Sequence, residues 1–142
     1  MKIRTALAGV AMVLCSGAFA AGPDYLFVDK SIDSLIDAAT AKAAFNEVNS
    51  MRLAKLYPPK IWGFTSQVSG GITPSGTCVV TARAMLLPRN NPHNTKLLLF
   101  KPERMATAFD AVPNASADKC REVAKAKLHE AFEALIGVLA PT

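Results

Sequence analysis

The sequence predicts an α+β fold, in which a small antiparallel sheet of two or three strands packs against an N-terminal helical region and a long C-terminal helix, with one disulfide. Three observations lead to this prediction. Ser75–Leu87 alternates as a strand does, and Ser116–Leu139 carries the strongest helical apolar stripe in the chain. Cys78 lies in the first segment and Cys120 in the second.

Residues 1–20, MKIRTALAGVAMVLCSGAFA, have the layout of a secretory signal peptide. Lys2 and Arg4 precede an apolar run, Ala6–Leu14, and the small residues Ala18 and Ala20 frame a cleavage position after Ala20. A retained anchor is the alternative, but this run is well short of the ~20 residues that a membrane-spanning helix needs. We therefore expect a periplasmic or secreted protein that has no stable membrane insertion after cleavage.

Cleavage leaves residues 21–142, which is the length of a single ordinary domain. The chain has 16 Lys and Arg and 11 Asp and Glu, and loss of Lys2 and Arg4 reduces the basic count to 14 and the net charge to +3. The basic excess is small and scattered along the chain. It therefore argues against nucleic acid as a partner.

The mature chain keeps two of the three cysteines, because Cys15 lies in the predicted signal peptide. An even pair in an oxidising compartment favours a disulfide between Cys78 and Cys120. The alternative is a redox-active or catalytic thiol. A redox pair is typically a close C-x-x-C, and a nucleophilic cysteine is expected to have a histidine and no partner cysteine, so the alternative has less support.

The N-terminal part of the mature chain is predicted to be mainly helical. Ala21–Lys30 is an irregular lead-in whose YLFV patch suits either an edge strand or a covering segment. From Ser31, a suitable cap, apolar residues recur at helical spacing up to Tyr57, and Pro58 ends the run. The apolar phase slips within the run, so we expect either one bent helix or two helices.

Two strands are predicted next, followed by a partner strand. Ile61–Ser69 alternates as a first strand, and the glycine-rich Ser69–Gly76 forms a loop. In Ser75–Leu87, one face is uniformly apolar and the other is mixed. Thr95–Phe100, TKLLLF, is the natural antiparallel partner of that strand.

The C-terminal part is predicted to contain a short and a long helix. Glu103–Phe109 suits a short helix. Ser116 suits the cap of the long helix and Asp118 its first turn, and Pro141 stops it.

Several segments resemble the C-terminal domain of TolA and the related TonB domain. They are the strand opening at Thr77-Cys78, the segment LLLFKPE (Leu97–Glu103) and the helix DKCREVAKAKL (Asp118–Leu128). The resemblance covers about Leu56–Leu135. It implies a small sheet flanked by helices, a disulfide from strand to helix, and docking of a protein at a sheet edge by strand addition.

No catalytic or metal-binding pattern stands out in the sequence. His93 and His129 are far apart, and His129 beside Glu133 is typical of a solvated helix face. Ser75, between proline and glycine, reads as a turn residue. We therefore expect no catalytic residue, no metal and no cofactor.

The candidate binding surface combines two groups of residues. Tyr57, Trp62 and Phe64 cluster around the Pro58-Pro59 turn, although burial in the core is the alternative for these aromatics. Arg83 and Met85 belong to the mixed face of the central strand.

The function that fits these features best is a non-enzymatic domain of the bacterial envelope that binds another envelope or secreted protein. The alternatives are an exported immunity or inhibitor protein directed against a toxin or hydrolase and, with less support, a small envelope hydrolase.

Overall fold

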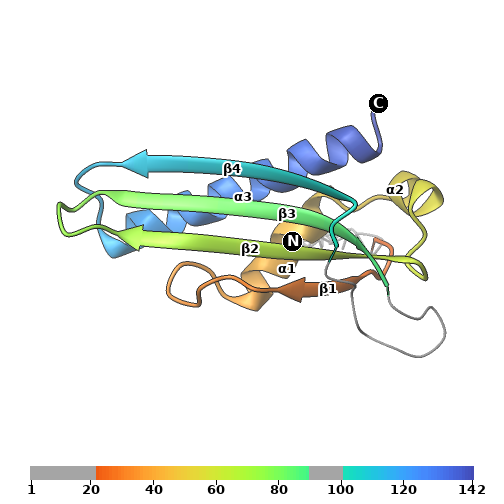
Figure 1. Cartoon of the computed structure of the whole chain (residues 1–142), viewed down its shortest axis with the longest axis horizontal. Helices are drawn as coiled ribbons and strands as arrows, with labels where there is room; N and C mark the ends of the chain where they lie inside the picture. The colour runs from red at the N-terminus through yellow and green to blue at the C-terminus, as the bar shows by residue number, and fades with distance from the viewer. Residues whose placement is uncertain (1–21, 90–100) are drawn as a thin grey trace, which may run out of the picture.

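A computed structural model describes residues 22–89 and 101–142. Within these two ranges, four strands and three helices follow one another along the sequence (Figure 1). Their bounds are Leu26–Asp29 (β1), Ala38–Val48 (α1), Met51–Leu56 (α2), Trp62–Ile72 (β2), Cys78–Pro88 (β3), Arg104–Val112 (β4) and Ala117–Leu139 (α3). The predicted signal peptide lies outside the described residues.

The strands form one mixed sheet in the order β1-β2-β3-β4. β2, β3 and β4 are antiparallel neighbours, whereas β1 runs parallel to β2. The α+β class is therefore confirmed, but the predicted antiparallel sheet of two or three strands was wrong in strand number and in direction. β1 is only four residues long, too short for its alternation to distinguish a strand from a covering segment.

Among residues 22–89 and 101–142, the helices cover only one face of the sheet. α1 and α3 lie behind the three long strands, and α2 lies at one end of the molecule (Figure 1). We call the opposite side of the sheet, on which neither α1 nor α3 lies, the front face. In the part of the chain that the structure describes, the front face therefore has no helix packed against the long strands.

The first helix begins later than predicted, because Ser31 forms hydrogen bonds with residues of β1 and β2 instead of capping a helix. Its hydroxyl donates to Asp29 Oδ1 at 2.6 Å and accepts the Val68 N–H at 2.9 Å. These bonds hold the chain against β2 beyond the end of β1. α1 starts only after Asp37, whose carboxylate accepts the Thr40 N–H at 2.7 Å.

The helical region consists of two helices, one of the two arrangements expected from the slipped apolar phase. Ser50 interrupts the helical path and caps α2, because its Oγ accepts the Leu53 N–H at 3.2 Å. α2 ends at Leu56, two residues before Pro58.

β3 confirms the predicted central strand and its two faces. The fully buried side chains on its helix-facing side are Cys78, Val80, Ala82, Ala84 and Leu86. The other side chains point to the front face and range from exposed to buried.

The predicted partner of the central strand and the predicted short helix were both wrong. Thr95–Phe100 lies outside the described residues, and both edges of β3 are occupied by β2 and β4. Most of Glu103–Phe109 belongs to β4, where Ala106 lies opposite Ala84. The alanines and the methionine in this segment favour a helix when considered alone. Pairing with β3 outweighs this preference, because the strand conformation buries the alanines against the helices.

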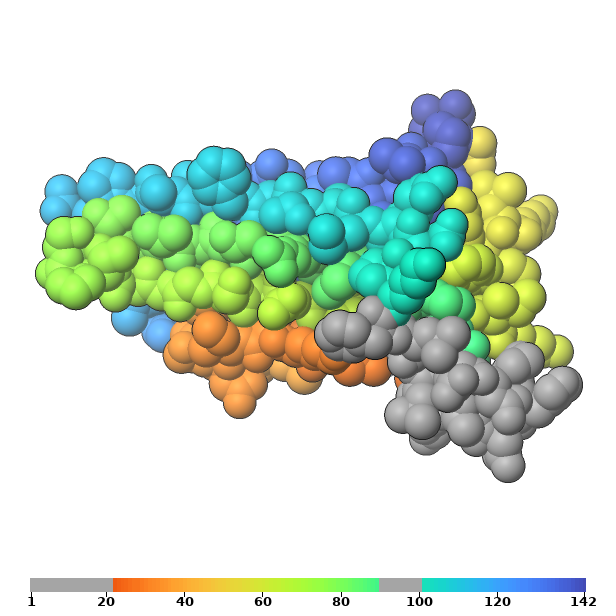
Figure 2. Space-filling view, in the orientation of Figure 1, coloured from red at the N-terminus to blue at the C-terminus, as the bar shows by residue number. Residues whose placement is uncertain are grey.

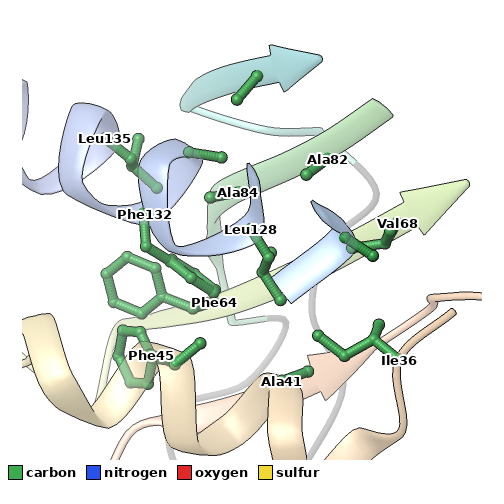
Figure 3. Close-up of a cluster of buried hydrophobic side chains, with 14 of the residues drawn as sticks. Ile36, Ala41, Phe45, Phe64, Val68, Ala82, Ala84, Leu128, Phe132 and Leu135 are labelled. Atoms are coloured by element: carbon green, nitrogen blue, oxygen red, sulfur yellow. The ribbon is translucent and has the colours of Figure 1, made fainter. Parts of the chain in front are cut away.

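The core is centred on Phe45 of α1, which is fully buried (Figure 3). Its ring centroid lies 4.7 Å from that of Phe64, 5.5 Å from that of Phe132 and 5.4 Å from that of Phe27. Aromatic packing at these distances joins β1, α1, β2 and α3 in one cluster.

Small side chains line the sheet beneath α3. Ala82 of β3 lies opposite Ala108 of β4, and Ala84 lies opposite Ala106. Because alanine projects little from the strand, it leaves room for the larger helix side chains, such as Leu128, to reach the sheet (Figure 3).

The predicted disulfide is confirmed. Cys78 and Cys120 are bonded, with their Cα atoms 5.5 Å apart. Both side chains are buried, so the bond lies between the sheet and α3 and not at the surface.

Candidate functional site

The front face is built from alternate residues of neighbouring strands. On β3 and β4 the cross-strand pairs are Met85 with Met105, Arg83 with Thr107, Thr81 with Phe109 and Val79 with Ala111. Because paired residues in a sheet point to the same side, these side chains share one surface, which Figure 2 shows from the front.

The most exposed large apolar side chains of this face are on β4. Phe109 is 74% exposed and Met105 55% exposed, while Val79 on β3 is 37% exposed and Met85 is half-buried. An aromatic ring and two methionines gathered on one side of a sheet form an apolar patch of the kind that marks protein contacts.

Arg83 places a positive charge in the middle of this patch. Its side chain is exposed, and its neighbours in register are Gln67 on β2 and Thr107 on β4. Within residues 22–89 and 101–142, Arg83 forms no ion pair with a carboxylate, so its guanidinium is available to a carboxylate of a partner.

The side chains of the front face are less exposed toward the end of β3 that carries Leu87. Leu87, two residues beyond Met85, is 6% exposed, and Thr65, the neighbour of Met85 on β2, is 2% exposed. The front face is therefore most accessible on β4 and on the part of β3 from Val79 to Arg83.

The structure places the predicted surface residues in three different environments. Arg83 and Met85 lie on the front face as described. Phe64 is fully buried in the core, so the alternative of core packing holds for this residue and it offers no surface for a partner. Tyr57 and Trp62 are half-buried and pack against each other, with ring centroids 5.8 Å apart, at the edge of the core.

Met105 and Phe109 were missed from the sequence because their segment was predicted as a helix. If the segment is a strand, its side chains alternate between two sides of the sheet. Met105, Thr107 and Phe109 then lie on one side, and the charged or smaller residues Arg104, Ala106 and Ala108 lie on the other. That alternation is the signal that would have identified them.

A groove of about 570 Å³ lies between the start of α1 and the first turns of α3, away from the front face. Its charged lining residues are Asp33, Asp37, Asp118, Arg121, Glu122 and Lys125. Bonds from the Thr40 backbone N–H and hydroxyl lower the pKa of Asp37 below its usual value. Asp37 is thus an ionised helix cap and not a proton donor, and the lining contains no histidine, cysteine or serine.

His129 joins α3 to α1 through its contact with Glu47. Its Nε2 lies 3.0 Å from Glu47 Oε2, and its Nδ1 lies 3.6 Å from Glu133 Oε2. In the described parts of the chain, no three residues among His, Cys, Asp and Glu are arranged to hold a metal ion. His93 lies outside those parts.

The described helices also include none that is long and apolar enough to cross a membrane. Comparison with known proteins yields no matching family model and no significantly similar curated protein. The resemblance to the TolA and TonB domains therefore rests on the three segments quoted above and stays a prediction.

Proposed function

We propose that the chain is an exported, non-enzymatic domain of the bacterial envelope that binds another envelope or secreted protein on its front face. The observation that carries this proposal is the exposure of Phe109 and Met105, 74% and 55%, on a side of the sheet that α1 and α3 leave uncovered. Large apolar side chains exposed together on a sheet are costly to leave in water and are stabilised when a partner covers them.

Covering Phe109 would contribute substantially to the free energy of binding. Complete burial of a phenylalanine side chain contributes roughly 1.5–3 kcal/mol, so covering the exposed part of Phe109 is worth about one order of magnitude in affinity before the costs of association. Aromatic residues, methionine and arginine are also the types enriched at the centres of protein interfaces. Phe109, Met105, Met85 and Arg83 supply all three.

Export is supported by the predicted signal peptide together with the buried disulfide between Cys78 and Cys120, since such bonds persist in oxidising compartments. An immunity or inhibitor protein is the alternative within the same class. Both functions use a docking surface, and the identity of the partner distinguishes them, because an inhibitor binds a toxin or hydrolase.

A pull-down from an envelope extract tests the proposal. The mature wild-type protein is compared with Phe109→Asp, which places a charge in the front face, and with Met51→Asp, which changes a similarly exposed residue of α2. We expect one stoichiometric partner with wild type and with Met51→Asp, and its loss with Phe109→Asp.

Two results would contradict the proposal. Equal recovery with both variants would exclude the front face as the docking surface. A blank with wild type under several detergent and salt conditions would argue against a protein-binding function altogether.

A further inference from the structure

β4 is an edge strand whose outer side has no strand partner among residues 22–89 and 101–142. It is nine residues long, and its exposed backbone groups form a template for a further strand. We propose that this edge pairs antiparallel with the β4 of a second copy of the chain, so that the two sheets join into one continuous sheet.

The alternation of β4 restricts how two copies can pair. Met105, Thr107 and Phe109 point to the front face, and the residues between them point toward the helices. In an antiparallel pair, residues directly opposite each other share a face. One residue of β4 must therefore lie directly opposite the same residue of the second copy. The two-fold axis that relates the copies passes at the position of that residue and not between two successive residues.

The axis through Thr107 gives complementary neighbours on both faces. On the front face it places Met105 opposite Phe109 of the second copy. On the helix-facing side it places Arg104 opposite Asp110 of the second copy. By symmetry each pair occurs twice, so the junction contains two apolar pairs and two pairs of opposite charge.

The neighbouring axes lack this match. An axis through Ala106 sets Arg104 opposite Ala108, and an axis through Ala108 sets Arg104 opposite Val112. In both registers the arginine and the aspartate each face a residue without charge. The self-complementary sequence of β4 thus favours a second copy as the occupant of the edge, in a single register.

The two charged residues are available for this pairing. The Arg104 side chain is 58% exposed, and its guanidinium lies 3.7 Å from the carboxylate of Glu103. The Asp110 side chain is 44% exposed and lies 3.9 Å from Lys127 Nζ. Both charge contacts are long for ion pairs. Arg104 Nη1 also donates to the Glu103 carbonyl at 3.0 Å, and Asp110 Oδ1 accepts the Ala111 N–H at 2.8 Å, so pairing across the edge exchanges these local bonds of exposed side chains for a contact between opposite charges.

The side of α3 that lies next to the β4 edge carries an exposed apolar residue, Val138, that the second copy could contact. The contact between Lys127 and Asp110 shows that this side of the helix faces the β4 edge. Val138 is three helical turns further on, about 20° from Lys127 around the helix, and is 69% exposed. The C-terminal end of α3 extends past the β4 edge (Figure 1), where it would lie behind the β4 of the second copy.

This inference goes beyond the proposed function and is tested separately from it. Pairing at the edge leaves the front faces of the two copies side by side and uncovered. Arg104 points to the helix-facing side, so changing it leaves the front-face patch intact.

Sedimentation of the mature, disulfide-bonded protein between about 1 µM and about 1 mM provides the test, since the weakest specific dimers dissociate in this range. We expect a concentration-dependent dimer. Arg104→Asp should weaken it at least tenfold, because two aspartates then face each other, and Arg104→Asp combined with Asp110→Arg should restore it. Arg52→Asp, on the exposed surface of α2, is the matched control and should leave it unchanged.

A cysteine trap defines the register. Thr107→Cys lies on the proposed axis and should give a covalent dimer on mild oxidation, whereas Ala111→Cys, on the same face of β4 but far from the axis, should not. A monomer throughout the concentration range would overturn the inference. So would a dimer that neither responds to the charge changes nor forms the Thr107→Cys link.

Discussion

Cys78 is the first residue of β3 and Cys120 lies in the first turn of α3, so their disulfide joins a central strand of the sheet to the helix that covers it. The bond closes a long loop that includes all of β4. It therefore restricts the unfolded chain as well as fixing the position of α3.

Removal of this bond should lower the free energy of unfolding by about 4 kcal/mol, because a loop with a sequence separation of 42 residues is no longer closed in the unfolded state. Urea unfolding of Cys78→Ala with Cys120→Ala measures the loss. Reduced wild type is the matched control and should unfold at nearly the same urea concentration. Thiol counting on the denatured, unreduced mature protein should find no free thiol, and two free thiols would contradict the bond.

Phe45→Ala should destabilise the fold by about 3–5 kcal/mol, because the ring is fully buried at the centre of the aromatic cluster. Phe109→Ala removes an equally large side chain from the front face and should change stability by less than about 0.5 kcal/mol. Chemical denaturation of the two variants provides the comparison. Similar losses for both would mean that Phe109 is part of the core.

Gly70→Ala should destabilise the fold more than Gly71→Ala. Both glycines have positive φ angles, 122° and 145°, which cost a residue with a side chain roughly 1–3 kcal/mol. A Cβ at Gly70 would also lie 1.9 Å from the backbone oxygen of Val79, whereas a Cβ at Gly71 meets no atom within 4 Å. Thermal unfolding should therefore show the larger decrease for Gly70→Ala, and equal decreases would contradict the close approach of β2 to β3.

Tyr25 should make the fold sensitive to strongly alkaline pH. Its side chain is 2% exposed and its hydroxyl donates to the Tyr57 carbonyl at 2.6 Å, and burial raises its pKa from 10.0 to about 12. Below pH 10 the phenol is protonated in both states and its contribution is constant. Between pH 10 and pH 12 the unfolded chain loses the proton while the folded chain retains it, so stability falls.

Unfolding by urea at pH 9 and pH 11 measures this effect, with Tyr25→Phe as the comparison. The variant should be less stable at pH 9, by about 1 kcal/mol for the lost hydrogen bond, and should lose less stability than wild type at pH 11. Identical decreases in the two proteins would show that Tyr25 does not titrate with folding.

The features predicted correctly from the sequence are those set by strong local patterns. The stripe of α3 and the alternation of β3 each extend over several turns or residue pairs, and both were confirmed. The disulfide was predicted from the two cysteines that lie outside the predicted signal peptide. In each case the local preference and the position in the fold agree.

The errors concern segments whose conformation depends on residues far away in the sequence. Ser31 looks like a helix cap until Asp29 and Val68 are brought beside it by the sheet. The segment around Ala106 has helical composition, but pairing with β3 makes it a strand. That error also removed Phe109 and Met105 from the predicted surface, so only half of the front-face patch was found.

The most direct test of the docking face is site-specific photocrosslinking in intact cells. A photoreactive residue is placed at Arg83, Met105 or Phe109 on the front face, and at Met51 or Glu122 on the exposed helices as matched controls. Mass spectrometry of the adducts separates a second copy of this chain from a different protein. The front-face positions should each yield an adduct with the same envelope or secreted protein, and the helix positions should not. Adducts from the helix positions alone, or no adduct with another protein from any front-face position, would contradict the proposed function.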